Sequence, residues 1–146
     1  MRVVVQRVSR ADVAVEGAAI AEIGRGLLVL AGFKQGDAAQ QLQWIAQKIV
    51  GLRIFEDAEG KMNLSVGDIE GGVLLVPNFT LYADCQKGRR PGFSGAAAPE
   101  PAGRLFDEFC IMVQELDIPV AKGHFGAHMQ VSLTNDGPVT LIIDSP

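Results

Sequence analysis

The chain has 146 residues, of which 48% are hydrophobic and 21% are charged, so we expect one soluble globular domain over residues 1–146. Its formal net charge of −4 argues against capture of nucleic acid by the surface as a whole, but it leaves room for a local basic site. No apolar run reaches the ~20 residues of a membrane span, no signal-peptide layout opens the chain, and the two cysteines form no CxxC pair, which indicates a reduced cytoplasmic protein.

The first part of the chain has the pattern of a curled antiparallel sheet. Apolar residues predict four short strands, over 2–8, around 13–15, over 18–23 and over 27–33. Turn residues separate them at Glu16-Gly17 and at Gly24-Arg25-Gly26. Short strands joined by Gly-rich turns are typical of sheets that curl on themselves.

Two helices are predicted farther along. The first runs over about 38–50, with Asp37 as its N-cap and Gly51 at its end. Helical spacing places four apolar residues on one face, namely Leu42, Ile45, Ala46 and Ile49. The second helix begins at Pro99 or Pro101, and its expected apolar face consists of Leu105, Phe109, Met112, Val113 and Leu116.

The segment between the helices is predicted to contain strands over 52–56 and 73–83, with a turn over 57–60 that leads into residues 61–64. Pro77 interrupts the last of these, and a proline inside a strand favours an edge position or a bulge. Residues 84–98 have no periodicity, so we expect a loop of about 15 residues, a length that is usually functional or mobile.

The final strands lie between 120 and 144, and we expect a hairpin turn at Thr134-Asn135-Asp136-Gly137-Pro138, because Asn, Asp and Gly tolerate positive φ. Pro138 lacks an N–H donor where the return strand begins. The Gly137-Pro138 pair is therefore either an ordinary hairpin exit or a rigid element that presents backbone carbonyls to a ligand. The order of elements predicts an α+β fold, with a curled, mainly antiparallel or barrel-like sheet and two flanking helices.

Familiar catalytic motifs such as G-x-S-x-G, H-E-x-x-H and the Walker loop are absent. His124 and His128 are four residues apart, but no third ligand is near in sequence, so we expect neither a metal nor a cofactor. The segment 76–84 leads into the basic cluster Lys87-Gly88-Arg89-Arg90. This combination suits a ligand that carries a base, a phosphate and a carbonyl, although a plain edge strand with packed Phe79 and Tyr82 would have the same pattern.

Taken together, these segments resemble the D-aminoacyl-tRNA deacylase family over nearly the whole chain. The matching stretches, in order, are Val4–Val8, Leu52–Asp57, Gly60–Asn63, Lys87–Pro91, Gly123–Met129 and Asn135–Thr140. The resemblance implies a homodimer that hydrolyses the ester between tRNA and a D-amino acid or glycine. It also implies that Gly137-Pro138 is a Gly-cisPro element that enters the partner's pocket and rejects L-amino acids, with Met129 in the substrate-binding set.

The family's Ser-Gln-Phe-Thr-Leu motif reads Pro77-Asn78-Phe79-Thr80-Leu81 here. The resemblance therefore assigns the catalytic positions to Asn78, Phe79 and Thr80. Backbone N–H groups near Phe79 and Thr80 are implied to hold the oxyanion. Thr80 is implied either as a nucleophile or as a positioning residue beside a tRNA 2′-hydroxyl that assists the reaction. Contacts to the tRNA backbone are expected from Lys87, Arg89 and Arg90.

Two alternatives remain open. The first is a non-catalytic module that binds adenosine or RNA 3′ ends on the same scaffold, because Pro77 and Asn78 depart from the family motif. The second is a metal-dependent hydrolase that uses His124 and His128.

Overall fold

Six strands form one curled sheet in which antiparallel pairs predominate. The computed structural model describes all residues 1–146, and its elements are β1 (Arg2–Val15), β2 (Ala18–Ile23), β3 (Gly26–Gly32), α1 (Ala39–Gly51), β4 (Phe55–Glu56), β5 (Met62–Leu64), β6 (Gly72–Pro77), the 3-10 helix η1 (Phe79–Tyr82), α2 (Pro99–Gln114), β7 (Val120–Lys122) and β8 (Met129–Asp144). The long strand β1 organises the sheet: β3 pairs with its first half, β2 with its second half and β8 with nearly all of it. Parallel pairing occurs only where β6 joins β3 and β7.

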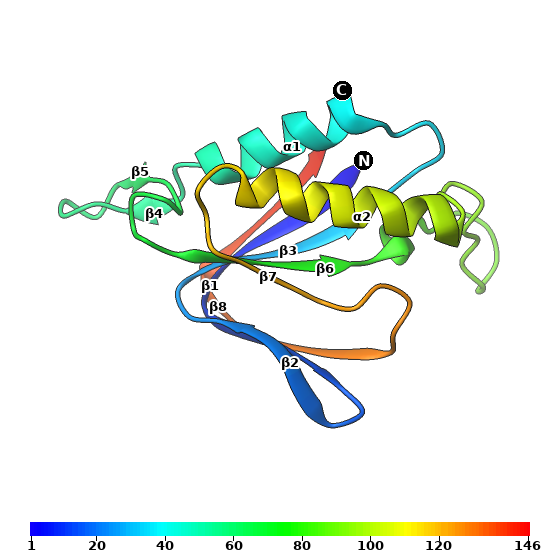
Figure 1. The fold of residues 1–146 in the computed structure, drawn as a ribbon, viewed down its shortest axis with the longest axis horizontal. Coiled ribbons are helices and arrows are strands. Elements are labelled where there is room, and N and C mark those ends of the chain that lie inside the picture. The colour runs from blue at the N-terminus through cyan, green and yellow to red at the C-terminus, as the bar shows by residue number, and fades with distance from the viewer.

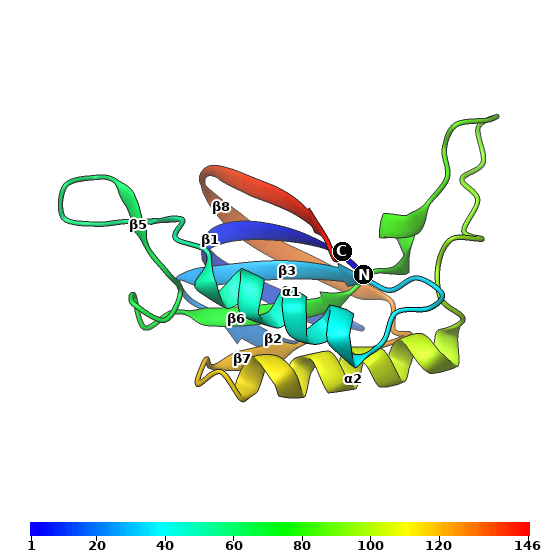
Figure 2. The ribbon, with the colours of Figure 1, turned by 90° about the horizontal axis from the view of Figure 1, so that it is seen from above.

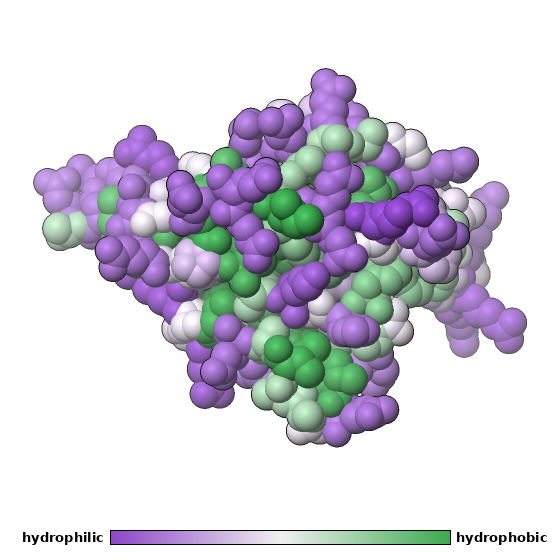
Figure 3. All heavy atoms as spheres, viewed as in Figure 1, coloured by the Kyte–Doolittle hydropathy of each residue, from purple (hydrophilic) through white to green (hydrophobic).

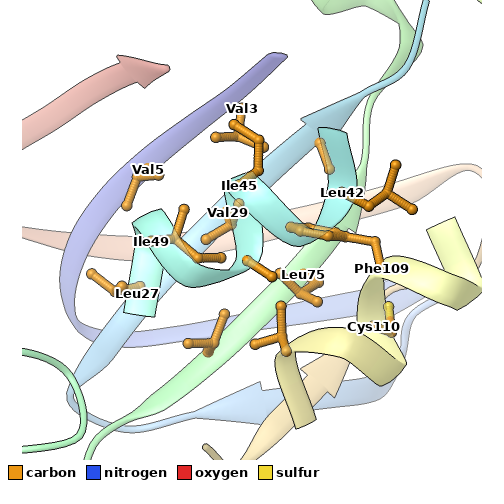
Figure 4. Close-up of a cluster of buried hydrophobic side chains, with 14 of the residues drawn as sticks. Val3, Val5, Leu27, Val29, Leu42, Ile45, Ile49, Leu75, Phe109 and Cys110 are labelled. Atoms are coloured by element: carbon orange, nitrogen blue, oxygen red, sulfur yellow. The ribbon is translucent and has the colours of Figure 1, made fainter. Parts of the chain in front are cut away.

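Both helices cover the same face of the sheet (Figure 1). Between the helices and the strands lies a core of 22 buried residues. Figure 4 shows side chains of α1, including Leu42 and Ile45, and Phe109 of α2 directed toward Val29 and Leu75 on the strands. A smaller cluster, which includes Leu28 and Leu74, fills the inside of the curl. Strands buried on both faces require a continuous apolar run, which explains the sequence of β3. The predicted α+β, barrel-like fold with two helices is confirmed.

The first helix begins one residue later than predicted, and Asp37 is not its N-cap. That position is held by Ala38. The Asp37 carboxylate instead accepts hydrogen bonds from the α-amino group of Met1 and from the N–H of Lys34, so it is unavailable for capping. The predicted buried face is confirmed, since it contains Leu42, Ile45, Ala46 and Ile49.

The second helix begins at Pro99, which is one of the two predicted starts. Its buried face is rotated relative to the predicted one. Phe109 and Val113 are buried as expected, whereas Leu105, Met112 and Leu116 are only partly buried. The remaining buried positions are Ala102, Phe106 and Cys110. Contact with α1 on one side and the sheet on the other selects this face, and sequence periodicity cannot detect that contact.

The predicted strand over 73–83 is wrong in its second half. β6 ends at Pro77, and the chain turns into η1. β6 lies between β3 and β7, but β7 pairs only with Val73–Leu75, so at Pro77 the strand pairs with β3 alone and forms a local edge without a bulge. The proline lies at the last position of the strand, where its missing N–H costs little, and pairing extends only to the Asn78 N–H, which donates to the Ala31 carbonyl at 2.8 Å.

The predicted hairpin near residue 137 is also wrong, because 129–144 forms one continuous strand along β1. Gln6 pairs with Thr140 and Val8 with Asn135, so residues 136–139 lie opposite Arg7 alone. The 14-residue β1 is long enough to pair with both apolar runs, which therefore do not pair with each other. The turn residues form a wide bulge in β8 instead.

The molecule has two projecting ends. In Figure 2 the β4–β5 hairpin extends from one end, and the connection between η1 and α2 extends from the other. Of the predicted strand over 52–56 only Phe55–Glu56 is regular, and it pairs with β5. Neither helix has the length and apolar character needed to cross a membrane.

Candidate functional site

A cavity of about 670 Å³ opens at the end of the molecule where β6 leads into η1. Its walls come from three connections that meet there: β6 to η1, η1 to α2, and β7 to β8 (Figure 1). Its lining includes Asn78, Phe79, Phe93, Ala97, His128 and Met129. Twelve of the 17 lining residues are hydrophobic, so the cavity suits a ligand with an apolar or aromatic part.

Two phenylalanine rings stand at this cavity. Phe79 is 55% exposed and Phe93 is 38% exposed, which is unusual for such large apolar side chains. Their ring centroids are 5.1 Å apart, and the rings meet edge to face at 65°. Exposed aromatic rings beside a cavity are a common platform for stacking a nucleobase.

The start of η1 places backbone donors beside the cavity. Phe79 and Thr80 are its first residues, and the first N–H groups of a helix have no partner within the helix. The Thr80 hydroxyl donates to Asn78 Oδ1 at 2.5 Å. Its proton is therefore held by an amide oxygen, which is not a base, and Thr80 itself does not line the cavity.

Arg2 ties η1 to the end of β8. Its Nε and Nη2 donate to both carboxylate oxygens of Asp144, at 2.8 and 3.0 Å, and its Nη1 donates to the Leu81 carbonyl at 3.3 Å. The guanidinium also lies 5.5 Å from the centre of the Tyr82 ring. The hydrogen bond from Arg2 holds the pKa of the Asp144 carboxyl below its ordinary value, and burial raises the pKa of Tyr82 to about 12.

Replacing Arg2 with alanine is expected to lower the free energy of unfolding by about 0.5–1 kcal/mol at neutral pH, the size of an exposed ion pair. Because the pKa of Asp144 is depressed in the folded state, this contribution is present above the ordinary carboxyl pKa and is lost as the pH falls through the folded-state value. Urea unfolding of both proteins at pH 7 and below pH ~3 checks this. A difference that grows on acidification would contradict it.

The bulge of β8 is held in shape by Asn135. The Asn135 amide donates to the Val139 carbonyl at 3.2 Å and to the Thr140 hydroxyl at 2.9 Å, and its Oδ1 accepts from the Val139 N–H at 2.7 Å. A further hydrogen bond joins it to Gln6 on β1. One side chain thus clamps both ends of the segment that contains Gly137 and Pro138.

The side chain of Arg7, on the neighbouring strand β1, supports the bulge. It is only 6% exposed, and its Nε and Nη1 donate to the carbonyls of Asp136 and Ile54, both at 2.7 Å. Gly137 has φ +150°, and a Cβ there would lie 2.8 Å from the backbone N of Val139. The Gly137–Pro138 peptide bond is cis. Only glycine fits this position without displacing the bulge.

The structure brings some of the predicted site residues together and leaves others apart. Asn78, Phe79 and Met129 line the cavity, and Thr80 is hydrogen-bonded to Asn78 beside it. Gly137 and Pro138 are exposed on the bulge and do not line the cavity of their own chain. The basic residues Lys87, Arg89 and Arg90 are exposed in the connection between η1 and α2 and take part in no ion pair.

Sequence reasoning did not single out Phe93, His128, Arg7 or Asn135 for the positions they hold. One signal was available for Arg7, which follows Val3 and Val5 on the same face of β1. That alternation places a charge in the core, where it needs a partner. His124 is exposed, as is His128, and no three His, Cys, Asp or Glu side chains are grouped closely enough to hold a metal ion.

Comparisons with known proteins agree on one family. The family model described as D-Tyr-tRNA(Tyr) deacylase matches residues 4–144. Relatives named D-aminoacyl-tRNA deacylase include one from Geobacter sp. (strain M21), 54% identical over 100% of this chain and 98% of the relative, and one from Desulfitobacterium hafniense (strain Y51), 55% identical over 99% and 97%.

Two solved structures have the same fold. One, titled "c-Myc DNA Unwinding Element Binding Protein", has a TM-score of 0.94 and 41% identity, over 100% of this chain and 99% of the other. The second, titled "Structural Analysis of a probable eukaryotic D-amino acid tRNA deacylase", has a TM-score of 0.80 and 23% identity over 97% of each chain, and at that identity it supports the fold alone. With the match over residues 4–144 and the relatives above half identity, the chain belongs to the D-aminoacyl-tRNA deacylase family.

Proposed function

We propose that this protein is a tRNA-editing hydrolase that cleaves the ester between tRNA and a D-amino acid or glycine. The observation that carries this proposal is the start of η1, where the first backbone N–H groups of a helix lie beside a largely apolar cavity flanked by two exposed phenylalanines. Acting on charged tRNA, the protein would work in the cytoplasm. No metal or cofactor takes part in the mechanism proposed here.

The proposed reaction is hydrolysis of a carboxylic ester. Water adds to the carbonyl carbon, and the negative charge that develops on the carbonyl oxygen is stabilised by the N–H groups of Phe79 and Thr80. The bond to the ribose oxygen of the terminal adenosine then breaks, that oxygen takes a proton, and the free amino acid leaves. The neighbouring 2′-hydroxyl of the tRNA assists the proton transfer, so the protein mainly positions the ester.

Selection between enantiomers is proposed to come from the backbone of Gly137 and Pro138 in a homodimer. D and L residues carry the same atoms, so apolar contacts discriminate poorly between them, whereas a fixed wall excludes one by steric clash. The bulge is suited to be that wall, because Asn135 and Arg7 hold it in place. It does not line the cavity of its own chain, so it would act in the cavity of a second copy.

The tRNA backbone is proposed to contact Lys87, Arg89 and Arg90. These residues are exposed in the same connection that contributes Phe93 to the cavity. A local basic segment of this kind attracts phosphates in spite of the net charge of −4.

Release of amino acid from charged tRNA tests the proposed activity. The purified protein is expected to free D-tyrosine from D-tyrosyl-tRNA and glycine from glycyl-tRNA, with chelator present and no metal added. Binding of tRNA or adenosine without release would instead favour the non-catalytic binding module. Loss of activity with chelator and in His128→Ala would favour the metal-dependent alternative.

Thr80→Val is expected to retain kcat for D-tyrosyl-tRNA within about tenfold, because the Thr80 hydroxyl faces an amide oxygen and no base activates it. A nucleophilic hydroxyl would behave differently, since removing a catalytic nucleophile typically costs about 10⁴-fold or more in kcat. Thr80→Ser, which keeps the hydroxyl, is the matched control. A collapse of kcat in Thr80→Val alone would assign Thr80 as the nucleophile.

A further inference from the structure

We infer that a second cavity beside the first binds the cytidylate that precedes the terminal adenosine at the 3′ end of tRNA. This inference rests on the proposed function, which places the terminal adenosine and its amino acid in the first cavity. The second cavity measures about 440 Å³, a size typical of small-ligand sites. Its lining includes Lys34, Gln35, Asp37, Phe93, Ser94 and Leu105.

The two cavities are neighbours with a common wall. Phe93, Ala96, Ala97 and Ala98 line both of them. Three of these four residues are alanines, so no bulky side chain other than Phe93 separates the two spaces. The Phe93 ring is 38% exposed, and it borders both cavities, so a base in the second can lie against it.

The chemistry of the second cavity differs from that of the first. The first is lined by hydrophobic residues apart from a few polar groups, whereas the second offers the Lys34 ammonium, the Gln35 amide and the Ser94 hydroxyl. An ammonium, an amide and a hydroxyl match a phosphodiester and the polar edge of a pyrimidine. A purely apolar occupant would leave these three groups unused.

Lys34 is available to bind an anion. Its Nζ takes part in none of the ion pairs of the molecule. Asp37 also lines the cavity, but its side chain is fully buried and paired with the α-amino group of Met1. The carboxylate is therefore already neutralised, and the exposed Lys34 ammonium carries the free charge of this cavity.

The backbone around the second cavity is fixed before a ligand arrives. Lys34 forms an antiparallel bridge with Ala96, and the Ala97 N–H donates to the Phe33 carbonyl at 2.9 Å. The Lys34 N–H donates to Asp37 Oδ2 at 2.8 Å. These contacts hold the segment around Lys34 against the segment around Ala96, so the backbone needs little ordering when a ligand binds.

The covalent structure of tRNA connects the two sites. An adenosine in the first cavity continues through its 5′-phosphate to the preceding cytidine, so that phosphate must lie at the border of the adenosine site. The wall that the two cavities share is this border, and Lys34 lines the cavity on its far side. The phosphate therefore lies where the Lys34 ammonium attracts it. Phosphates farther along would then meet Lys87, Arg89 and Arg90.

Binding of uncharged fragments tests the second site without any chemical step. By titration calorimetry at fixed salt, the dinucleotide CpA is expected to bind the wild-type protein about tenfold more tightly than adenosine, the gain expected of one charge-assisted contact. Lys34→Ala should abolish this gain and leave adenosine binding unchanged. The matched control is Lys48→Ala, since Lys48 is an α1 lysine that lies over Trp44 and lines neither cavity.

A second measurement keeps the test independent of the variant's folding. CpA with an uncharged methylphosphonate linkage should lose the tenfold gain on the wild-type protein. The inference is overturned if CpA binds no more tightly than adenosine, if neither binds, or if Lys34→Ala weakens both equally. If CpA is preferred through Lys34 but D-tyrosyl-tRNA is not hydrolysed, the second site stands and the proposed activity fails.

Discussion

Gly137→Ala is expected to lower kcat/KM for D-tyrosyl-tRNA by about 100-fold, the cost of misplacing a substrate-contacting group by roughly 1 Å. The added Cβ would lie 2.8 Å from both the backbone N and Cγ2 of Val139, and 3.2 Å from Nη2 of Arg7. The φ of +150° also strains any L residue at this position. The bulge must therefore shift, and the proposed steric wall shifts with it. Initial rates on D-tyrosyl-tRNA measure the effect.

The matched control for this variant is Gly24→Ala. Gly24 is in a turn, and a Cβ there meets nothing within 4 Å, so activity should stay near that of the wild type. Because Gly137 is exposed, the variant should remain folded. Wild-type activity in folded Gly137→Ala would contradict the role assigned to the bulge.

The same variant tests whether the bulge acts across subunits. Phe79→Ala alters the cavity instead, at an exposed ring. In a mixed dimer of the two variants, one site would combine an intact cavity with the intact bulge of the other chain. Co-expressed variants are therefore expected to regain activity that neither has alone. No recovery in a confirmed mixed dimer would place the bulge and cavity of a site in one chain.

Arg7→Leu is expected to lower the free energy of unfolding by about 3 kcal/mol, because two carbonyls that the buried guanidinium satisfies lose their hydrogen-bond donors. Those carbonyls belong to Asp136 and Ile54, both 2.7 Å from Arg7 nitrogens. Leucine fills part of the space but donates nothing. Urea denaturation gives the magnitude.

Arg10→Leu on the same strand is the control for Arg7→Leu, since Arg10 is exposed and makes no side-chain hydrogen bond or ion pair to the rest of the chain. It should change stability by less than about 0.5 kcal/mol. Because Arg7 also supports the bulge, Arg7→Leu should lose activity at temperatures where it is still folded. Equal stability of the two variants would show that Arg7 is not a supporting residue.

Local patterns predicted those parts of the fold that depend on neighbours in sequence. The spacing of Leu42, Ile45, Ala46 and Ile49 specified the buried face of α1, because periodicity records which side of a helix meets the core. The run over 27–33 located β3 for the same reason. For these two elements, a window of a few residues was enough to predict the type.

The errors occurred where a distant residue competes with a local signal. Asp37 has the chemistry of an N-cap, but the α-amino group of Met1 takes its carboxylate. The turn residues around Gly137 suggest a hairpin, but the length of β1 allows both flanking runs to pair with it. Neither competition is visible in a short window of sequence.

Only part of the candidate site could be predicted, because distant segments of the chain bring the other residues together. Asn78, Phe79 and Met129 were identified through the family resemblance, and in the structure all three line one cavity. No sequence motif pointed to Lys34 or Phe93. They gain a role only because the Lys34–Ala96 bridge brings distant segments of the chain to one wall.

The ratio of kcat/KM for D-tyrosyl-tRNA to that for L-tyrosyl-tRNA measures how strongly the proposed backbone wall at Gly137 and Pro138 selects between enantiomers. A backbone wall that admits only one enantiomer predicts a ratio of about 10⁴ or more, which corresponds to roughly 5.5 kcal/mol. Glycyl-tRNA, which has no side chain to exclude, should be hydrolysed as well. A ratio near one, with both enantiomers released at similar rates, would show that the bulge does not select between them.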